Sequence, residues 1–339
     1  MGYPPQRLEI GGLLKCLVPF GSQDKVSIVS HHEIGVIGVV GLGNMRMGMA
    51  RTLSRDGFSV VGFDISTARL AEADRVGVAI VAELSQLFDA ACTIVLSLPT
   101  AFHVKAVLVG ENGLARRALT PRLIIDTTTS QPDVTRALAA RLRALGHRLI
   151  DGPVSGGKAR AESGRLTVMV GGENDDVARA MTVLSSLGAE IHHVGPVGAG
   201  HSVKIVSNIL LASHLPTMSE AARLGNAAGV STDKLIAALN AGSGRSAVSE
   251  INYPQKVMKE AFDGGFTMGL MRKDVHLAME LAKSKNLVLP VLAKAGEIWA
   301  QSSDTLADDS DVHRMTEYRS DQNRSKTRRK RVSANADAN

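Results

Sequence analysis

From residue 35 onward, short apolar runs alternate with segments in which apolar residues recur at helical spacing. Val, Ile and Leu dominate the runs, which read "IGVIGVV" (34–40), "SVVGFD" (59–64), "CTIVLSL" (92–98), "RLIIDT" (122–127), "RLIDGPV" (148–154) and "LTVMVGG" (166–172). The segments between them, such as 44–56 and 67–76, fit amphipathic helices. Apolar strands that alternate with helices are typical of a parallel sheet covered on both faces. We therefore predict a doubly wound α/β domain over residues 35–195.

The pattern changes near Gly198. A long apolar-rich helix is expected over 201–228, and further helical segments cover 273–285 and 290–301. This part of the sequence therefore predicts a second, all-helical domain over residues 196–318.

The two ends of the chain differ from both domains. Residues 1–34 lack the basic start and the small-residue cleavage site of a secretory signal, so we expect a poorly structured extension. Residues 319–339 carry seven Lys or Arg against two Asp and show no apolar periodicity, which predicts a disordered basic tail. Most of the net charge of +6 lies in this tail. A solvated tail is favoured over one that binds nucleic acid, so nucleic acid is not an expected partner.

Composition excludes several function classes. Aromatic residues make up only 3% of the chain, too few for a base-stacking surface. No apolar run reaches the roughly 18 residues that span a bilayer. We expect no membrane contact and a cytoplasmic protein. The cysteines, Cys16 and Cys92, and the histidine pairs at 31–32 and 192–193 lack the ligand spacing of a metal site, so no metal is expected.

A glycine-rich turn follows the first predicted strand. Gly41, Leu42 and Gly43 lead directly into a predicted helix, where backbone N–H groups can approach a pyrophosphate. Asp64 closes the second strand, and its carboxylate can accept hydrogen bonds from ribose hydroxyls while repelling a 2′-phosphate. The turn therefore predicts a dinucleotide site that favours NAD, with NADP possible. The alternative role for Asp64 is to cap the following helix.

Arg46 departs from this pattern, because it stands where a third small residue normally lets the helix pack close to the sheet. We expect its side chain to push the helix outward or to extend past the edge of the sheet, which would weaken the cofactor contact. Gly48 is no substitute, since it lies on another face of the helix. The opposite case stays open: Arg46 can also pair with the cofactor's phosphates.

Lys204 and Asn208 are one helical turn apart, so both project from one face. A Lys ammonium can give a proton to a carbonyl oxygen and its amine can remove one in reverse, while an Asn amide orients a substrate. Ser155, Gly156 and Gly157 follow a strand end and expose backbone amides that suit a carboxylate.

Lys273 and Asp274 open a predicted helix, where such a charge pair is also ordinary helix chemistry.

Taken together, these motifs resemble the β-hydroxyacid dehydrogenase family, which includes 3-hydroxyisobutyrate dehydrogenase, tartronate semialdehyde reductase and 2-(hydroxymethyl)glutarate dehydrogenase. The resemblance runs from about residue 35 to 316. It implies a Rossmann-type domain, a helical domain, and a homodimer or homotetramer formed through the helical domain. Arg46 is the main departure, because the family has glycine there.

The resemblance also assigns roles to residues. "GLGNM" resembles the cofactor turn, "LPTAFHV" the stretch beside the nicotinamide ribose, "IIDTTTSQP" the next cofactor-side loop, and "PVSGG" the substrate loop. "GAGHSVKIVSN" resembles the catalytic helix, with Lys204 as the catalytic lysine. Cofactor-binding roles fall on Gly41, Leu42, Gly43, Asn44, Met45, Asp64, Leu98, Pro99, His103, Thr129 and Lys273. Substrate-binding roles fall on Ser155, Gly156, Gly157, Asn208 and Asp274.

We therefore expect an NAD(P)-dependent oxidoreductase that interconverts a small 3-hydroxy carboxylic acid and its semialdehyde, similar to 3-hydroxyisobutyrate dehydrogenase. One alternative is tartronate semialdehyde reductase. Imine reductases of the same fold lack the lysine found here at 204. A catalytically inactive scaffold that binds chromatin is favoured by the basic tail and Arg46, and disfavoured by Lys204, Asn208 and Asp274.

Overall fold

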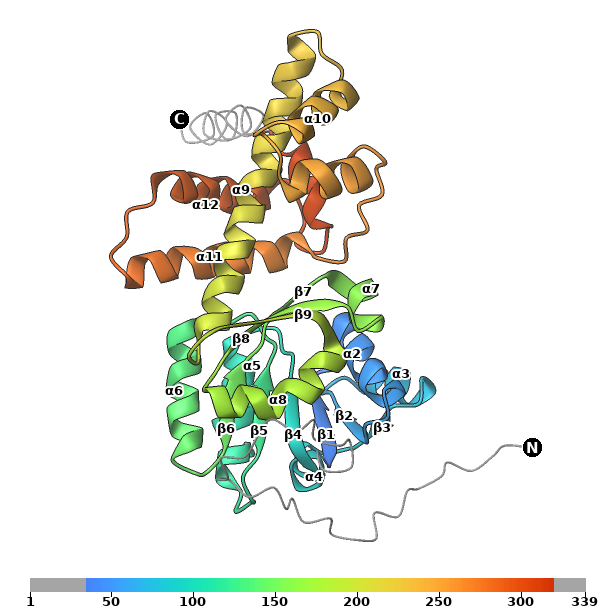
Figure 1. The fold of residues 1–339 in the computed structure, drawn as a ribbon, viewed down its shortest axis with the longest axis vertical. Coiled ribbons are helices and arrows are strands. Elements are labelled where there is room, and N and C mark those ends of the chain that lie inside the picture. Colours follow the sequence, from blue (N-terminus) through green and yellow to red (C-terminus); the bar gives the residue numbers. More distant parts are fainter. Residues whose placement is uncertain (1–34, 320–339) are drawn as a thin grey trace, which may run out of the picture. The chain divides into compact units, whose positions relative to one another are not determined.

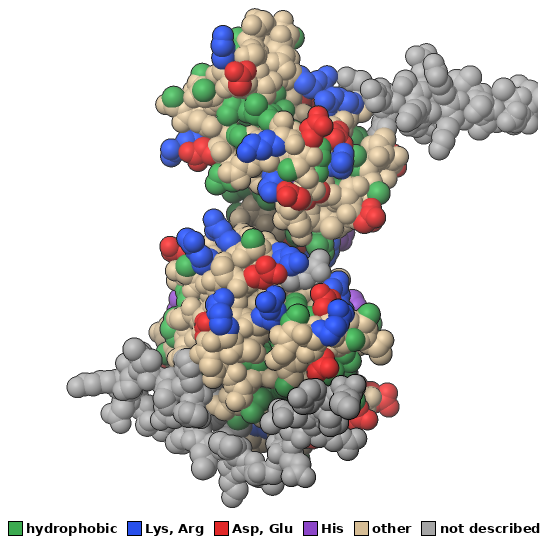
Figure 2. Space-filling view, turned by 90° about the vertical axis from the view of Figure 1, so that its right-hand side faces the viewer, with side chains coloured by type: hydrophobic (Ala, Val, Ile, Leu, Met, Phe, Trp, Pro, Cys, Tyr) green, Lys and Arg blue, Asp and Glu red, His purple; other side chains and the backbone are tan. Residues whose placement is uncertain are grey.

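The computed structural model describes residues 35–319, which form two compact units (Figure 1). The first, the dinucleotide unit, comprises 35–128 and 133–199, and the second, the helical unit, comprises 129–132 and 200–319. The extension predicted at 1–34 and nearly all of the tail predicted at 319–339 lie outside the described residues. Figure 2 shows Lys and Arg side chains interspersed with Asp and Glu on the face that it draws. Among the described helices, none combines the length and apolarity needed to cross a membrane.

The dinucleotide unit is built on one nine-stranded sheet. Its strands are β1 (Val36–Val40), β2 (Val60–Phe63), β3 (Ala79–Ile80), β4 (Ala91–Leu96), β5 (Leu123–Asp126), β6 (Arg148–Asp151), β7 (Val154–Ser155), β8 (Leu166–Gly171) and β9 (Gly188–Gly195). They lie in the order β3-β2-β1-β4-β5-β6-β8-β7, with β9 also paired to β8. The chain therefore moves outward from β1 through β2 and β3, then returns to the other side of β1 at β4. That reversal is a topological switch point, where doubly wound folds bind ligands.

Helices cover both faces of this sheet (Figure 1). They are α2 (Asn44–Arg55), α3 (Thr67–Arg75), α4 (Leu84–Ala90), α5 (Ala101–Val109), η1 (Leu114–Arg116), α6 (Pro132–Arg143), α7 (Gly157–Glu162) and α8 (Asn174–Leu187). Alternate strand residues point to opposite faces, so Ile125 packs in the core beneath α2 and α8, whereas its neighbour Ile124 packs in the core beneath α4, α5 and α6. The predicted doubly wound α/β architecture is confirmed.

Two features of the sheet differ from the sequence prediction. First, β8 runs antiparallel to both β6 and β7, so the sheet is mixed at this edge. Second, β9 has mostly exposed residues, and its sequence GAEIHHVG shows no apolar run. Pairing with β8 forms this strand, which a pattern search along the sequence does not reveal.

The helical unit contains α9 (Ala199–Ala227), α10 (Thr232–Ala241), η2 (Val248–Val257), α11 (Met268–Ser284), α12 (Pro290–Gln301), η3 (Ser302–Asp304) and η4 (Val312–Glu317). Its core contains the fully buried Trp299. The three helices expected from the sequence are present. However, α11 begins at Met268 and is capped by Thr267, whose Oγ1 accepts from Leu270 N at 3.3 Å. Lys273 and Asp274 therefore lie in the second turn, and the reading of them as an N-terminal charge pair is wrong.

A proline inside α9 is accommodated by a side chain from α12. Pro216 has no N–H and cannot donate to the carbonyl oxygen of Ala212 four residues earlier. The indole Nε1 of Trp299 donates to that oxygen instead, at 2.7 Å. This hydrogen bond satisfies a buried carbonyl and fixes α12 against the middle of α9.

Candidate active site

The glycine turn at the end of β1 requires residues without a side chain. Gly41 has φ +90°, and a Cβ there would lie 2.5 Å from the carbonyl oxygen of Ser97 at the end of β4. Gly43 is the N-cap of α2 and offers no side-chain cap. The positive end of the helix is therefore free of a capping side chain and can receive a ligand beside the topological switch point. Leu42, Asn44 and Met45 complete this segment.

Asp64 braces the turn. Its Oδ2 accepts from Leu42 N at 2.7 Å, and its Oδ1 accepts from Ser66 N at 2.8 Å. The N-cap of α3 is Ser66, whose Oγ accepts from Arg69 N at 3.4 Å, so the capping role left open for Asp64 belongs to Ser66. Each carboxylate oxygen has further lone pairs, which leaves Asp64 able to accept hydrogen bonds from ribose hydroxyls.

The Arg46 side chain does not extend past the edge of the sheet, which corrects that expectation. Its Nε donates to Ser97 Oγ at 3.2 Å, and its Nη1 lies 3.0 Å from the position of a Cβ on Gly43. The side chain thus folds back over the turn. Burial lowers the pKa of Arg46, the Asp64 carboxylate opposes that shift, and the charge of Arg69 adds to it. An arginine remains charged even so.

Gly48 serves a different contact. A Cβ on Gly48 would lie 3.0 Å from Glu162 N, so its absence lets α2 pack closely on α7. One turn further along α2, Thr52 Oγ1 donates to the carbonyl oxygen of Ala161 at 2.9 Å. The helix that follows the glycine turn therefore holds the helix that follows residues 155–157.

The loop expected to bind substrate starts at Ser155, the last residue of β7, which pairs with Thr167. Gly156 and Gly157 follow with φ of +136° and +73°, which other residues adopt only under strain. Both glycines therefore present their backbone amides without a side chain in the way.

The remaining residues of the dinucleotide unit that are expected to contact a cofactor follow β4. Leu98 N donates to Thr128 Oγ1 at 2.9 Å, and Pro99 continues the loop toward α5. His103, in the first turn of α5, shares a 2.8 Å hydrogen bond between its Nδ1 and Thr100 Oγ1. Sequence reasoning missed Ser97 and Thr128, although both are polar residues at the carboxyl ends of parallel strands, the position where such sheets bind ligands.

The helical unit brings four of the expected site residues together. Asn208 Nδ2 donates to Asp274 Oδ2 at 2.5 Å, and Lys273 Nζ lies 3.0 Å from Asp274 Oδ1. Lys273 Nζ also donates to the carbonyl oxygen of Thr129 at 3.2 Å. Asn208 and Asp274 are almost fully buried, at 5% and 1% exposure.

Lys204 lies one turn before Asn208 on α9 and keeps partial exposure. Burial nevertheless lowers the pKa of its ammonium group, while Asp274 acts to raise it and Lys273 lowers it further. The direction that dominates is downward. Lys204 therefore gives up its proton more easily than an ordinary lysine, which suits a proton-transfer group.

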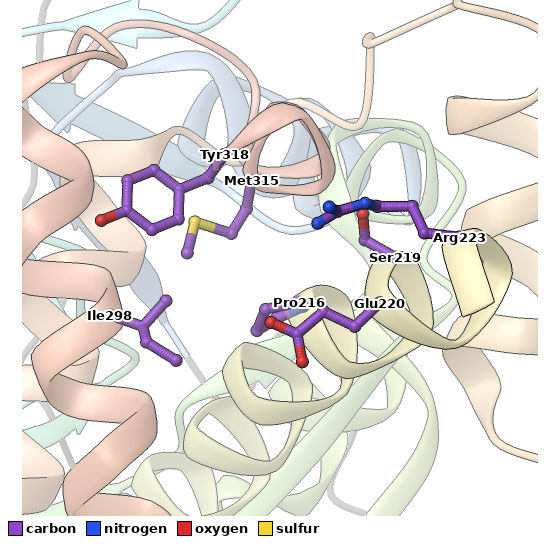
Figure 3. Close-up of a pocket in the computed structure, with 7 residues that line it drawn as sticks. All are labelled: Pro216, Ser219, Glu220, Arg223, Ile298, Met315 and Tyr318. Carbon is purple, nitrogen blue, oxygen red and sulfur yellow. The ribbon is translucent and has the colours of Figure 1, made fainter. Parts of the chain in front are cut away.

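Figure 3 shows a pocket elsewhere in the helical unit, where Glu220 and Arg223 of α9 face Ile298 and Tyr318. Pro216, also in its wall, follows Lys204 by about 18 Å along the helix axis. The pocket is thus distinct from the lysine cluster. Within residues 35–319, no group of three or more His, Cys, Asp or Glu side chains is arranged to hold a metal ion.

Known proteins match both units. Residues 36–195 match the family model of the NAD binding domain of 6-phosphogluconate dehydrogenase, and residues 198–318 match that described as NAD-binding of NADP-dependent 3-hydroxyisobutyrate dehydrogenase. The 2-(hydroxymethyl)glutarate dehydrogenase of Eubacterium barkeri is 37% identical over 78% of this chain and 87% of its own. The mitochondrial 3-hydroxyisobutyrate dehydrogenase of Mus musculus is 32% identical over 83% of this chain and 86% of its own.

A solved structure is similar as well. The Mycobacterium tuberculosis 3-hydroxyisobutyrate dehydrogenase with L-serine superposes with a TM-score of 0.78 at 28% identity. The match covers 84% of this chain and 98% of that one.

Proposed function

Because the chain belongs to the β-hydroxyacid dehydrogenase family, we propose that it interconverts a small 3-hydroxy carboxylic acid and the corresponding semialdehyde, with NAD as its preferred cofactor. Family membership makes it an NAD(P)-dependent hydroxyacid dehydrogenase. The choice of NAD, the 3-hydroxy acid and the roles of single residues are the proposal. None of the relatives described above supports the scaffold alternative.

The observation that carries the proposal is the cluster of Lys204, Asn208 and Asp274. In the oxidative direction, the neutral amine of Lys204 removes the proton of the substrate hydroxyl while a hydride leaves the carbon that bears this hydroxyl. The bound nicotinamide supplies the acceptor for that hydride. In the reductive direction, the Lys204 ammonium returns a proton to the carbonyl oxygen. A lowered pKa makes the neutral amine of Lys204 easier to form, which favours the use of this one lysine in both directions.

Asn208 orients the substrate in this scheme. Its Nδ2 is held by Asp274, which fixes the plane of the amide and leaves its Oδ1 and second N–H for the substrate. Asp274 acts through that hydrogen bond and through its charge on Lys204. Ser155, Gly156 and Gly157 bind the substrate carboxylate through the Ser155 hydroxyl and the two glycine amides.

The cofactor turn fits a dinucleotide diphosphate, because Gly41 and Gly43 keep the helix terminus clear of side chains. Leu42, Asn44 and Met45 contribute to the same segment. Asp64 binds the adenosine ribose and disfavours the 2′-phosphate of NADP. Leu98, Pro99 and His103 border the nicotinamide ribose, and Thr129 and Lys273 complete the cofactor contacts.

A homodimer or homotetramer formed through the helical unit is also proposed. Val203, Val206 and Leu210 on α9 are 39%, 51% and 46% exposed, and their spacing puts them on one stripe of the helix. An exposed apolar stripe of this kind suits contact with a second copy. The cytoplasmic location expected from the sequence stays a prediction.

The test is a substrate panel. Purified full-length protein is incubated with NAD or NADP and with 3-hydroxyisobutyrate, glycerate, threonate or 2-(hydroxymethyl)glutarate, and formation of reduced nicotinamide is followed. We expect turnover of at least one of these acids. Intact dinucleotide binding without turnover of any acid, and without reduction of the matching semialdehydes, would contradict the proposal.

A further inference from the structure

We infer that Arg46 is a ligand of the cofactor's diphosphate. Its guanidinium supplies part of the free energy of diphosphate binding, whereas in a turn with glycine at this position the backbone amides supply it alone. The inference rests on the proposed function in one respect, since it requires a bound dinucleotide. The family has glycine where this chain has Arg46, so the role inferred for Arg46 does not follow from the family's pattern.

The first argument is position. The Arg46 side chain leaves the first turn of α2 and folds back over the glycine turn, with Nη1 against Gly43. A Cβ on Gly41 would also lie 3.4 Å from Arg46 Cδ, so the side chain lies over both glycines. The turn and the helix terminus are the elements that bind diphosphate in this fold. The guanidinium therefore lies beside the place where the two phosphate charges would bind.

The second argument is how the side chain is held. Ser97 Oγ accepts from Nε at 3.2 Å and anchors the side chain from the end of β4. A guanidinium carries further N–H donors on its two Nη atoms, and these are the ones suited to paired phosphate oxygens. The hydrogen bond through Nε thus orders the side chain before a ligand binds and leaves the N–H donors of the two Nη atoms for that ligand.

The third argument is charge. Burial disfavours the charge of the Arg46 guanidinium, and the Asp64 carboxylate favours it. That carboxylate already accepts hydrogen bonds from two backbone N–H groups. A diphosphate would restore the lost stabilisation of that charge. Arg69, the other cation near this turn, is paired with Glu72 at 2.7 Å and is the less available partner.

The fourth argument is that the close contact of α2 with α7 lies at another residue. A Cβ on Gly48 would lie 3.0 Å from Glu162 N, so this contact requires the absence of a side chain at residue 48 and not at residue 46. Arg46 is thus accommodated in the fold, where its side chain occupies the space over the glycine turn.

The test compares ligands with and without a diphosphate. Arg46→Gln, Arg46→Lys and Arg46→Gly are titrated with NADH by fluorescence and with ADP, 2′,5′-ADP and adenosine by calorimetry, at low and high salt. Arg51→Gln is the matched control, because Arg51 is exposed on the same helix. Thermal melts of every variant show whether it is folded.

We expect Arg46→Gln and Arg46→Gly to weaken NADH and ADP binding about tenfold or more, the effect of losing a charged hydrogen bond. Adenosine affinity should not change, and the affinity for NADH should depend less on salt than in the wild type. Arg46→Lys should keep the salt dependence, and Arg51→Gln should stay within about twofold of wild type.

Tighter or unchanged NADH binding by Arg46→Gly would overturn the inference and make Arg46 a steric intrusion. A loss confined to 2′,5′-ADP would also overturn it, because Arg46 would then read a 2′-phosphate. If the wild-type protein binds neither NADH nor NADPH, the proposed function itself fails. Dinucleotide binding that is unaffected by every Arg46 variant contradicts only the inference.

Discussion

Asn208 Nδ2 lies 2.5 Å from Asp274 Oδ2, and this hydrogen bond joins α9 to α11 across the core of the helical unit. The same carboxylate lies 3.0 Å from Lys273 Nζ through its other oxygen. Its charge also acts on Lys204, one turn from Asn208. Asp274 therefore couples the orientation of the amide to the proton affinity of the lysine.

This coupling predicts opposite pH shifts for two variants. Oxidation needs the neutral amine, so the rate should rise with pH through the pKa of Lys204, which burial places below the ordinary 10.5. Asp274 raises the pKa of Lys204, so Asp274→Asn should move the rise in kcat to lower pH. Lys273 lowers it, so Lys273→Met should move the rise to higher pH. The measurement is kcat against pH at saturating cofactor and substrate. Shifts in the same direction for both variants would show that the titrating group is not Lys204.

Asp64 should decide the choice of cofactor. Its carboxylate is fixed by Leu42 N and Ser66 N at the end of β2, where a 2′-phosphate would meet a like charge. We expect kcat/KM with NAD to exceed kcat/KM with NADP by about tenfold or more. A tenfold ratio corresponds to only a small part of the free-energy penalty for bringing two like charges together. Asp64→Asn should narrow the ratio. A wild-type preference for NADP would mean that Arg69, whose backbone N–H bonds Ser66, reads the 2′-phosphate instead.

The hydrogen bond from Trp299 to the Ala212 carbonyl should contribute to stability because Pro216 cannot make it. Trp299→Phe should destabilise the fold by about 1–3 kcal/mol through the unsatisfied carbonyl alone, with a further loss from the smaller ring. Pro216→Ala restores a backbone N–H to that carbonyl, so Trp299→Phe should cost less in that background. Denaturant unfolding of the two single variants and the double variant gives their coupling. Additive effects would show that the indole N–H is not compensating for the proline.

Structural features that depend on neighbouring residues could be predicted from the sequence, and features that depend on distant residues could not. The glycine turn, the apolar strands and the α9 pair of Lys204 and Asn208 are set by neighbouring residues, and the pattern along the chain predicted them. The strand β9 was missed because its residues are largely exposed and pairing with β8 forms it. The same limit applies to the Trp299 hydrogen bond, which joins residues far apart in the chain.

Arg46 shows the same limit within the candidate site. The sequence puts Arg46 in the position of a third glycine, and it left open a helix pushed outward, a side chain extended past the edge of the sheet, and a side chain paired with the cofactor's phosphates. The direction it takes depends on Ser97, a residue on β4 that no local pattern connects to the turn. The start of α11 depends on the Thr267 cap, and reading the helix from Lys273 overlooked it.

The most direct test of the account is the turnover of Lys204→Ala, with Lys204→Arg as a variant that keeps the charge but cannot act as the base. Removing a general acid and base lowers rates about 10²–10⁴-fold. We predict a loss of kcat in that range for both variants, with NADH affinity and melting temperature close to those of the wild type. Retention of more than about a tenth of the wild-type kcat by Lys204→Ala, far above that range, would contradict the assignment of Lys204 as the proton-transfer group.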